Sequence, residues 1–138
     1  MNSYMVTLHA VIERAEHNFG AYVEEIDGVG GIGDTLDEVK KDLEEGLVVL
    51  KEACIEDGYP VPEELQGEYE IVFKMDTRSF LKMYCKIFTK SALERMTGIN
   101  QKQLWHYANG LSTPRPATVA KIEKALHQLG EELLSLEL

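Results

Sequence analysis

The sequence predicts an α+β protein of 138 residues. We expect a small strand–strand–(strand)–helix–strand domain at residues 1–76 and an all-α domain of four to five helices at residues 77–138. The first half combines segments rich in β-forming side chains with one long helical pattern, whereas apolar residues recur at helical spacing in the second half. The charge divides at the same place. Residues 1–76 hold 5 basic and 19 acidic residues, a net charge of −14, and residues 77–138 hold 9 and 5, a net charge of +4.

Two segments, residues 4–13 and 19–26, predict the strands of a β-hairpin. The next segment, residues 27–33, contains four glycines, and we expect a tight bend that ends in a short strand. A phosphate-binding loop is the alternative. Its spacing fits neither known glycine-rich fingerprint, and the flanking acidic residues would oppose phosphate.

A long helix is predicted to start after Thr35, which can cap it together with Glu38. Apolar residues keep helical spacing through about Glu56. Gly58 and the following Pro-Val-Pro then end the helix, and residues 68–75 predict a last strand.

The all-α half is predicted to begin with a helix at residues 77–88. The segment Thr89–Gly110 then predicts two short helices separated by Gly98 and Ile99. Asn100 is a good N-cap for the second helix, with Gln103 in the position of a capping-box partner. A further helix is expected at residues 115–129, with Val119 facing inward and Gly130 interrupting it. The leucine-rich tail that follows needs a packing partner.

Two short helices with a tight break are typical of a helix-turn-helix, whose second helix enters the major groove of DNA. The outward face of that helix would carry Gln101, Lys102, Trp105 and His106. Gln pairs with adenine and Lys with guanine. Trp105 could stack on a neighbour or touch a thymine methyl, or equally serve as a packing residue. A plain helical hairpin is the alternative for the whole segment.

The segment from Gly98 to Pro116 resembles the Cro/repressor-type helix-turn-helix. Glu94 departs from that pattern, which usually has a small residue four positions before the turn glycine. The resemblance implies base-facing positions at Gln101, Lys102 and His106. It implies backbone-contacting positions around them, and the predicted DNA-binding set is Lys90, Asn100, Gln101, Lys102, Trp105, His106, Asn109, Ser112, Thr113 and Arg115.

The first half, from about residue 4 to 76, resembles the HicB antitoxin domain. The resemblance rests on the hairpin sequence ending in Ile-Asp-Gly, on Gly33-Asp34-Thr35 before the long helix, and on Pro60-Val61-Pro62 after it. It implies a partial ribonuclease-H-like fold and an antitoxin that neutralises a small basic, HicA-like, mRNA-cleaving toxin and represses its own operon. The expected toxin-binding residues are Glu24, Glu25, Asp27 and Asp34.

Two rival functions stay open. The first is a transcription regulator whose N-terminal domain senses a small ligand in a pocket lined by Tyr22 and Tyr69. The second is a nuclease-like hydrolase. Glu24 and Glu25, as neighbours on a strand, should face opposite sides with no His or Lys base beside them. We therefore expect no catalytic residue, no metal site and no cofactor.

The remaining expectations concern the cysteines, the cellular location and the oligomeric state of the protein. Cys54 and Cys85 have no metal-binding spacing and should be buried, reduced thiols. No apolar run reaches the roughly 18 residues of a membrane helix, and the N-terminus lacks signal-peptide features. We expect a cytoplasmic protein with no membrane contact. Because one helix-turn-helix reads only a half-site, we expect a homodimer or a tetramer.

Overall fold

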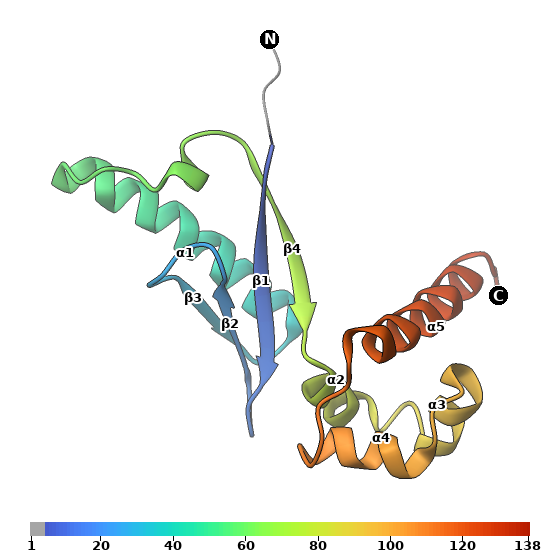
Figure 1. Ribbon diagram of the computed structural model, residues 1–138. Helices are drawn as coiled ribbons and strands as arrows, with labels where there is room; N and C mark the ends of the chain where they lie inside the picture. Colours follow the sequence, from blue (N-terminus) through green and yellow to red (C-terminus); the bar gives the residue numbers. More distant parts are fainter. Residues whose placement is uncertain (1–4) are drawn as a thin grey trace. The chain divides into compact units, whose positions relative to one another are not determined.

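The computed structural model describes residues 5–138 and shows a mixed α/β protein, in which a four-stranded sheet precedes a set of helices. The chain divides into two compact units, Met1–Asp76 and Thr77–Leu138. We call these the acidic unit and the basic unit, after their net charges. Figure 1 gives the elements and their labels.

The acidic unit is a sheet with one long helix. Its strands lie in the order β3-β2-β1-β4; β1 is antiparallel to β2 and parallel to β4, and β2 is antiparallel to β3. The elements are β1 (Val6–Arg14), β2 (Phe19–Val23), β3 (Gly30–Gly33), α1 (Leu36–Asp57), the 3-10 helix η1 (Glu63–Leu65) and β4 (Tyr69–Met75).

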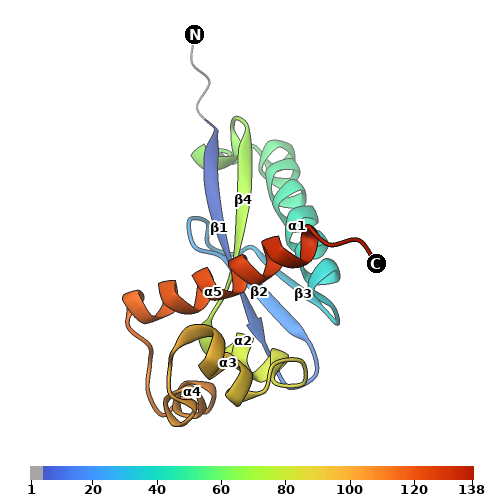
Figure 2. The same cartoon turned by 90° about the vertical axis from the view of Figure 1, so that its right-hand side faces the viewer.

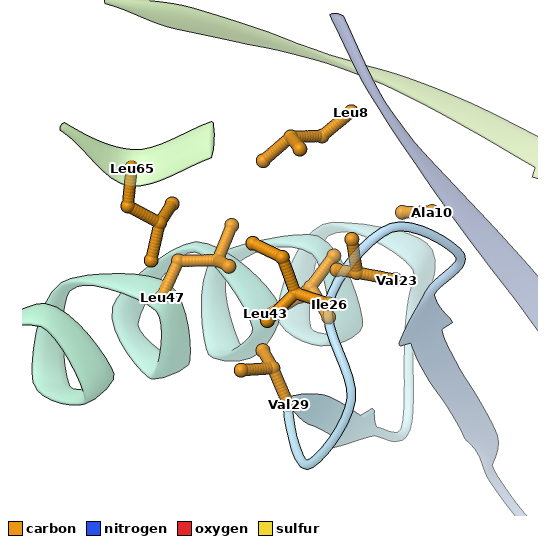
Figure 3. Close-up of a cluster of buried hydrophobic side chains, with 8 residues drawn as sticks. All are labelled: Leu8, Ala10, Val23, Ile26, Val29, Leu43, Leu47 and Leu65. Atoms are coloured by element: carbon orange, nitrogen blue, oxygen red, sulfur yellow. The ribbon is translucent and has the colours of Figure 1, made fainter. Parts of the chain in front are cut away.

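The core of this unit lies between α1 and one face of the sheet (Figure 3). Alternate residues of β1 point to opposite faces, so Leu8 and Ala10 are buried against α1. Leu43 and Leu47 meet them from the helix. In residues 5–76, no helix covers the opposite face of the sheet, which we call the open face (Figure 1).

The local signals at the two ends of α1 are confirmed. The Thr35 hydroxyl accepts a hydrogen bond from the Glu38 backbone N–H at 3.1 Å, and the Glu38 carboxylate accepts one from the Asp34 N–H at 2.8 Å. The Thr35 bond is the predicted N-cap, whereas Glu38 bonds to the N–H one residue before the cap and not to that of Thr35 itself. At the other end Gly58 adopts a left-handed conformation, with φ of 75°, and its N–H bonds back into the helix.

The glycines before α1 have a different role from the predicted one. Among them only Gly28 has a positive φ, of 81°. Gly31 and Gly33 are strand residues that lie against the backbone of α1. A Cβ on Gly31 would be 2.8 Å from the Val39 carbonyl oxygen, and one on Gly33 would be 2.5 Å from the Val39 nitrogen. These two glycines allow close packing of β3 on the helix rather than a turn.

The basic unit consists of helices α2 (Thr77–Tyr84), α3 (Lys90–Thr97), α4 (Gln101–Ala108) and α5 (Pro116–Leu134) (Figure 2). Apolar residues that recur at helical spacing in the sequence lie on the inner faces of these helices and pack together, as the sequence pattern predicts. The buried core of this unit comprises Leu81, Leu93, Ile99, Leu104, Tyr107 and Ile122.

Several predicted boundaries are wrong. Strand β2 ends at Val23, and residues 24–28 form bends and a turn. Helix α2 ends at Tyr84, whose carbonyl accepts from both Ile87 and Phe88, so the chain tightens into a turn there. Helix α5 continues through Gly130, because one glycine costs only about 1 kcal/mol relative to alanine. The first four residues of the chain, including Tyr4 of the first predicted strand, lie outside the described residues.

Several predicted burial states are wrong as well. Cys85 lies in the turn after α2 and is exposed, because the helix that would have buried it ends one residue earlier. Cys54 is half-buried. Val119 is exposed on the first turns of α5. The leucines of the tail, for which we predicted a packing partner, are exposed; Leu134 is 89% exposed and Leu136 62% exposed.

Candidate functional site

The best-defined candidate site is helix α4, and the end of α3 sets its position. Gly98 ends α3 in a left-handed conformation, with φ of 76°. The buried Thr97 hydroxyl donates to the Leu93 carbonyl at 2.7 Å and accepts from the Ile99 N–H at 3.1 Å. Ile99 itself is buried in the core of the unit. The connection between the two helices is therefore short and held by the hydrogen bonds of Thr97 and Gly98.

Two side chains satisfy the first N–H groups of α4. The Asn100 side chain accepts from the Lys102 N–H at 2.8 Å, which confirms Asn100 as the N-cap. The Glu94 carboxylate accepts from the Gln101 N–H at 2.9 Å. Glu94, the departure from the family pattern, thus places a negative charge at the positive end of α4.

The predicted capping box at this helix is wrong. The amide of Gln103 does not return to Asn100. It donates to the Ser112 hydroxyl at 3.1 Å and so ties α4 to the segment before α5.

Helix α4 has one buried and one exposed face. Leu104 and Tyr107 are buried in the core. On the other face Gln101 and Lys102 are exposed, Trp105 is 45% exposed, and His106 is half-buried. The rings of Trp105 and His106 lie with their centroids 5.7 Å apart. The four side chains expected on the outward face therefore reach solvent.

The flanking members of the predicted DNA-binding set surround α4 in the chain. Lys90 begins α3 and is half-buried. Asn109 caps the C-terminus of α4, where its amide donates to the Trp105 carbonyl at 2.9 Å. Thr113 and Arg115 are exposed, and Ser112 is half-buried. From Arg95 to Ile122 the sequence contains no acidic residue, so the potential of this segment is positive.

The acidic residues of the first unit are arranged differently from the prediction. Glu24 and Glu25 follow β2 rather than lie within it, so strand alternation does not fix their directions. His9, Glu24 and Glu25 each offer a ligand atom, and these atoms lie within 4.8 Å of one another. The prediction that these carboxylates do not converge and have no histidine beside them is therefore wrong.

The contacts of this cluster favour a hydrogen-bonded group over a metal centre. One Glu25 oxygen accepts from the His9 backbone N–H at 2.7 Å, and the other is 2.5 Å from Nδ1 of the His9 ring. Lys74 Nζ lies 3.9 Å from Glu24. Both Glu25 oxygens are thus engaged, and a cation already stands beside Glu24.

The pKa of Glu25 reflects these contacts. Partial burial on its own would raise the pKa of this carboxyl. The hydrogen bonds from the His9 backbone and ring favour the charged form and outweigh burial, so the pKa is lowered from its ordinary value. Glu25 is therefore a carboxylate that is held at the open end of the β1–β2 hairpin, opposite its turn.

The four acidic residues expected to bind toxin do not form one cluster. Asp27 follows Glu25 in the turn between β2 and β3. Asp34 lies beyond the other end of β3, because Gly30 pairs with Tyr22 and Gly33 pairs with Phe19. The length of β2 therefore separates Asp34 from Glu24 and Glu25.

The pocket expected between Tyr22 and Tyr69 does not form. Tyr69 pairs with Val6 and packs against the core below the sheet. Tyr22 pairs with Val11, an odd-numbered residue of β1, and projects from the open face. Their partners on β1, Val6 and Val11, are an odd number of positions apart, and such residues of a strand point to opposite faces. The two rings therefore lie on opposite faces of the sheet.

His9 is the residue that sequence reasoning missed. It alternates with the buried residues Leu8 and Ala10, which places it on the open face. The hairpin register pairs Ala10 with Val23, so one step further brings His9 opposite Glu24. A correct prediction of the turn at residues 15–18 would have fixed this register and so placed His9 beside Glu24.

Comparison of the chain with family models, curated proteins and solved structures finds no match. None of the helices in residues 5–138 combines the length and apolar character that a membrane span requires.

Proposed function

We propose that the protein is an antitoxin of the HicB type, with a separate task for each unit. The acidic unit binds and neutralises a small basic toxin that cleaves mRNA. The basic unit binds operator DNA as a helix-turn-helix and represses the operon that encodes the pair. The fold family and the class of the toxin rest on the sequence resemblance.

The observation that carries the DNA-binding part is the geometry of α4. Its inner face is anchored by Leu104 and Tyr107, and its first turn is capped by Asn100 and Glu94. Gln101 and Lys102 are exposed in that turn. A rigid helix with bidentate side chains at its N-terminal end is what readout in the major groove requires.

Charge supports the same assignment. The chain from Arg95 to Ile122 lacks acidic residues, and Lys90 and Arg115 flank α4. Lysine and arginine contacts to phosphate supply most of the sequence-independent affinity for DNA. The hydroxyls of Ser112 and Thr113 and the amide of Asn109 can add uncharged phosphate contacts.

For the toxin, the open face of the sheet is a more suitable surface than the four predicted acids alone. Tyr22, Ile32 and Val72 are 46%, 62% and 43% exposed and belong to this face. Acidic side chains lie among them, at Glu13, Glu24 and Glu70. Exposed aromatic and aliphatic groups with surrounding charge are typical of protein interfaces, and the negative charge steers a basic partner.

The DNA experiment is a titration of the full chain against the duplex upstream of its gene and against a scrambled duplex of equal length. We expect tighter binding to the upstream duplex at every salt concentration, with affinity falling as salt rises. Equal affinity for both duplexes would contradict the repressor role.

The toxin experiment uses the product of the adjacent reading frame. We expect a small basic protein that cleaves mRNA alone and loses this activity when mixed with the full chain. Charge reversal at Glu70 and Glu24 together should weaken the complex, since both acids lie beside the exposed apolar residues of the open face. If the product of the adjacent reading frame neither binds the full chain nor cleaves RNA, the antitoxin role is contradicted. The DNA experiment is unaffected by that result.

A further inference from the structure

A cavity of about 250 Å³ opens within the basic unit, between α2, the turn after it, the start of α3 and one side of α4. Core leucines Leu81, Leu93 and Leu104 contribute to its floor. Trp105 forms part of its wall and is also exposed to solvent. An apolar floor with an aromatic wall and a few polar groups is typical of small-molecule sites.

The polar groups around this cavity have one sign of charge. Lys82 and Lys90 line it, and none of its lining residues, all of which lie within residues 81–109, is acidic. Lys82 is exposed and Lys90 is half-buried, so a neutral apolar ligand would cover the leucines and gain nothing from either ammonium group. An anion with an apolar body would satisfy the lysines and cover the leucines at the same time.

From this geometry we propose that the cavity binds a small carboxylic acid with an aromatic or branched aliphatic body. The carboxylate meets Lys82 and Lys90, and the apolar body lies on the leucine floor beside the Trp105 ring. The volume is below that of most drug-sized sites, which limits the ligand to a single ring or a short branched chain.

Occupation of the cavity affects residues that also belong to the predicted DNA-binding set. Lys90, Trp105 and Asn109 all line it. A bound acid neutralises Lys90 and holds Trp105 against the ligand, so the protein should release DNA more readily. This consequence rests on the proposed function, whereas binding of the acid does not.

The binding test uses the fluorescence of Trp105, which is the only tryptophan of the chain. The full chain is titrated with phenylacetate and isovalerate and, as matched neutral probes, with phenylacetamide and isovaleramide, and calorimetry checks each titration. We expect at least one acid to bind with a dissociation constant in the millimolar range or below, as befits a ligand of this size. Its amide should bind about tenfold more weakly or not at all, because it cannot form charge-assisted bonds with the lysines.

Two variants test the location. Ala108 lines the cavity, so Ala108→Leu should fill part of it and abolish binding. Lys82→Gln should weaken the acid about tenfold and leave the amide unchanged, because only the charge-assisted bond is lost. Lys124→Gln, an exposed substitution on α5 outside this cavity, is the control and should bind like the original chain. Circular dichroism checks that each variant is folded; Lys82→Gln decides the matter if Ala108→Leu does not fold.

Three results would overturn the proposal. One is the absence of binding by all four compounds, and another is equal binding of acids and amides. The third is unchanged binding of the acid by Lys82→Gln, which would place the carboxylate elsewhere. An acid that binds without weakening the DNA complex would overturn the effector role and leave the site in place. A chain that binds the acid but no DNA would contradict the proposed function instead.

Discussion

The contact between Glu25 and His9 shows how much a single residue depends on tertiary structure. The carboxylate accepts from both the backbone and the ring of His9, and its pKa is lowered in the folded protein. A carboxyl whose folded pKa lies below its unfolded value stabilises the fold above the unfolded pKa. That stabilisation disappears as the pH falls through the folded value.

We therefore expect Glu25→Gln to lower the free energy of unfolding at neutral pH. The difference from the original chain should vanish below the ordinary pKa of 4.5, as the pH passes through the lowered value, because both side chains are then neutral. Urea unfolding across this range measures it. Glu16→Gln is the control, since the Glu16 side chain is 89% exposed and its loss should matter little at any pH. A difference that stays constant down to strongly acidic pH would contradict the assignment.

The proposed DNA recognition also depends on a single residue, Gln101. Its amide can donate to and accept from adenine, whereas alanine can do neither. Gln101→Ala should cost about 1–3 kcal/mol on the preferred duplex and relax the base preference there. Lys90→Ala or Arg115→Ala should weaken all sequences alike and lower the salt slope by about 1 each.

Titrations of these three variants against operator and scrambled duplexes at several salt concentrations make the comparison. Because Lys90 also lines the cavity, Arg115→Ala is the cleaner reference for loss of a phosphate contact. Equal losses on both duplexes for Gln101→Ala would show that α4 does not read bases.

At the scale of elements, the packing of β3 on α1 is the most constrained contact of the acidic unit. Gly31→Ala would place a Cβ 2.8 Å from the Val39 carbonyl oxygen and 2.9 Å from the Leu43 nitrogen. Since backbone atoms cannot move aside cheaply, we expect a loss of about 1–3 kcal/mol in the free energy of unfolding. Denaturant unfolding monitored by circular dichroism measures this loss.

Gly130→Ala is the matched control for that substitution. Gly130 lies within α5, and a Cβ there meets no atom within 4 Å. Alanine should stabilise this helix by about 0.5–1 kcal/mol. If Gly31→Ala proved as harmless as Gly130→Ala, the close approach of β3 to α1 would be wrong.

At the scale of the whole molecule, the division after Asp76 predicts two independent modules. Each unit has its own buried core, so each should fold alone. Residues 1–76 should bind the toxin without DNA, and residues 77–138 should bind DNA without the toxin. Pull-down and gel-shift experiments with the two fragments test this. Operator binding by the N-terminal fragment at the level of the full chain would contradict it.

Self-association is the second prediction at this scale. Helix-turn-helix dimers read two half-sites about 34–36 Å apart, and a lone copy reads only one. The exposed Leu133, Leu134 and Leu136 offer apolar surface at the end of α5. Deletion of residues 131–138 should weaken self-association and DNA binding together, as measured by sedimentation and titration. A truncated chain that stays dimeric at micromolar concentration would show that the contact lies elsewhere.

How far the sequence predicts each part depends on the distance over which its contacts act. Thr35, Gly58, Gly98 and Asn100 marked helix ends correctly, because capping joins groups within a few positions of one another. Gln103 was misassigned within the same segment. Its amide bonds instead to Ser112, nine residues away, and a contact of that range depends on the path of the chain after α4.

The sequence by itself determined the order of strands and helices, the buried stripes of α1 and α4, and the separation of charge between the two halves. These features follow from local propensity, from the period of apolar residues and from composition. Tertiary structure decided the pairing of His9 with Glu25, the exposure of Cys85, the need for glycine at Gly31, and the cavity beside Trp105. Each of these depends on strand register or on where a helix stops. A shift of one residue in the strand register, or in the position where a helix ends, turns a side chain to another face. A single sequence does not fix these positions to one residue.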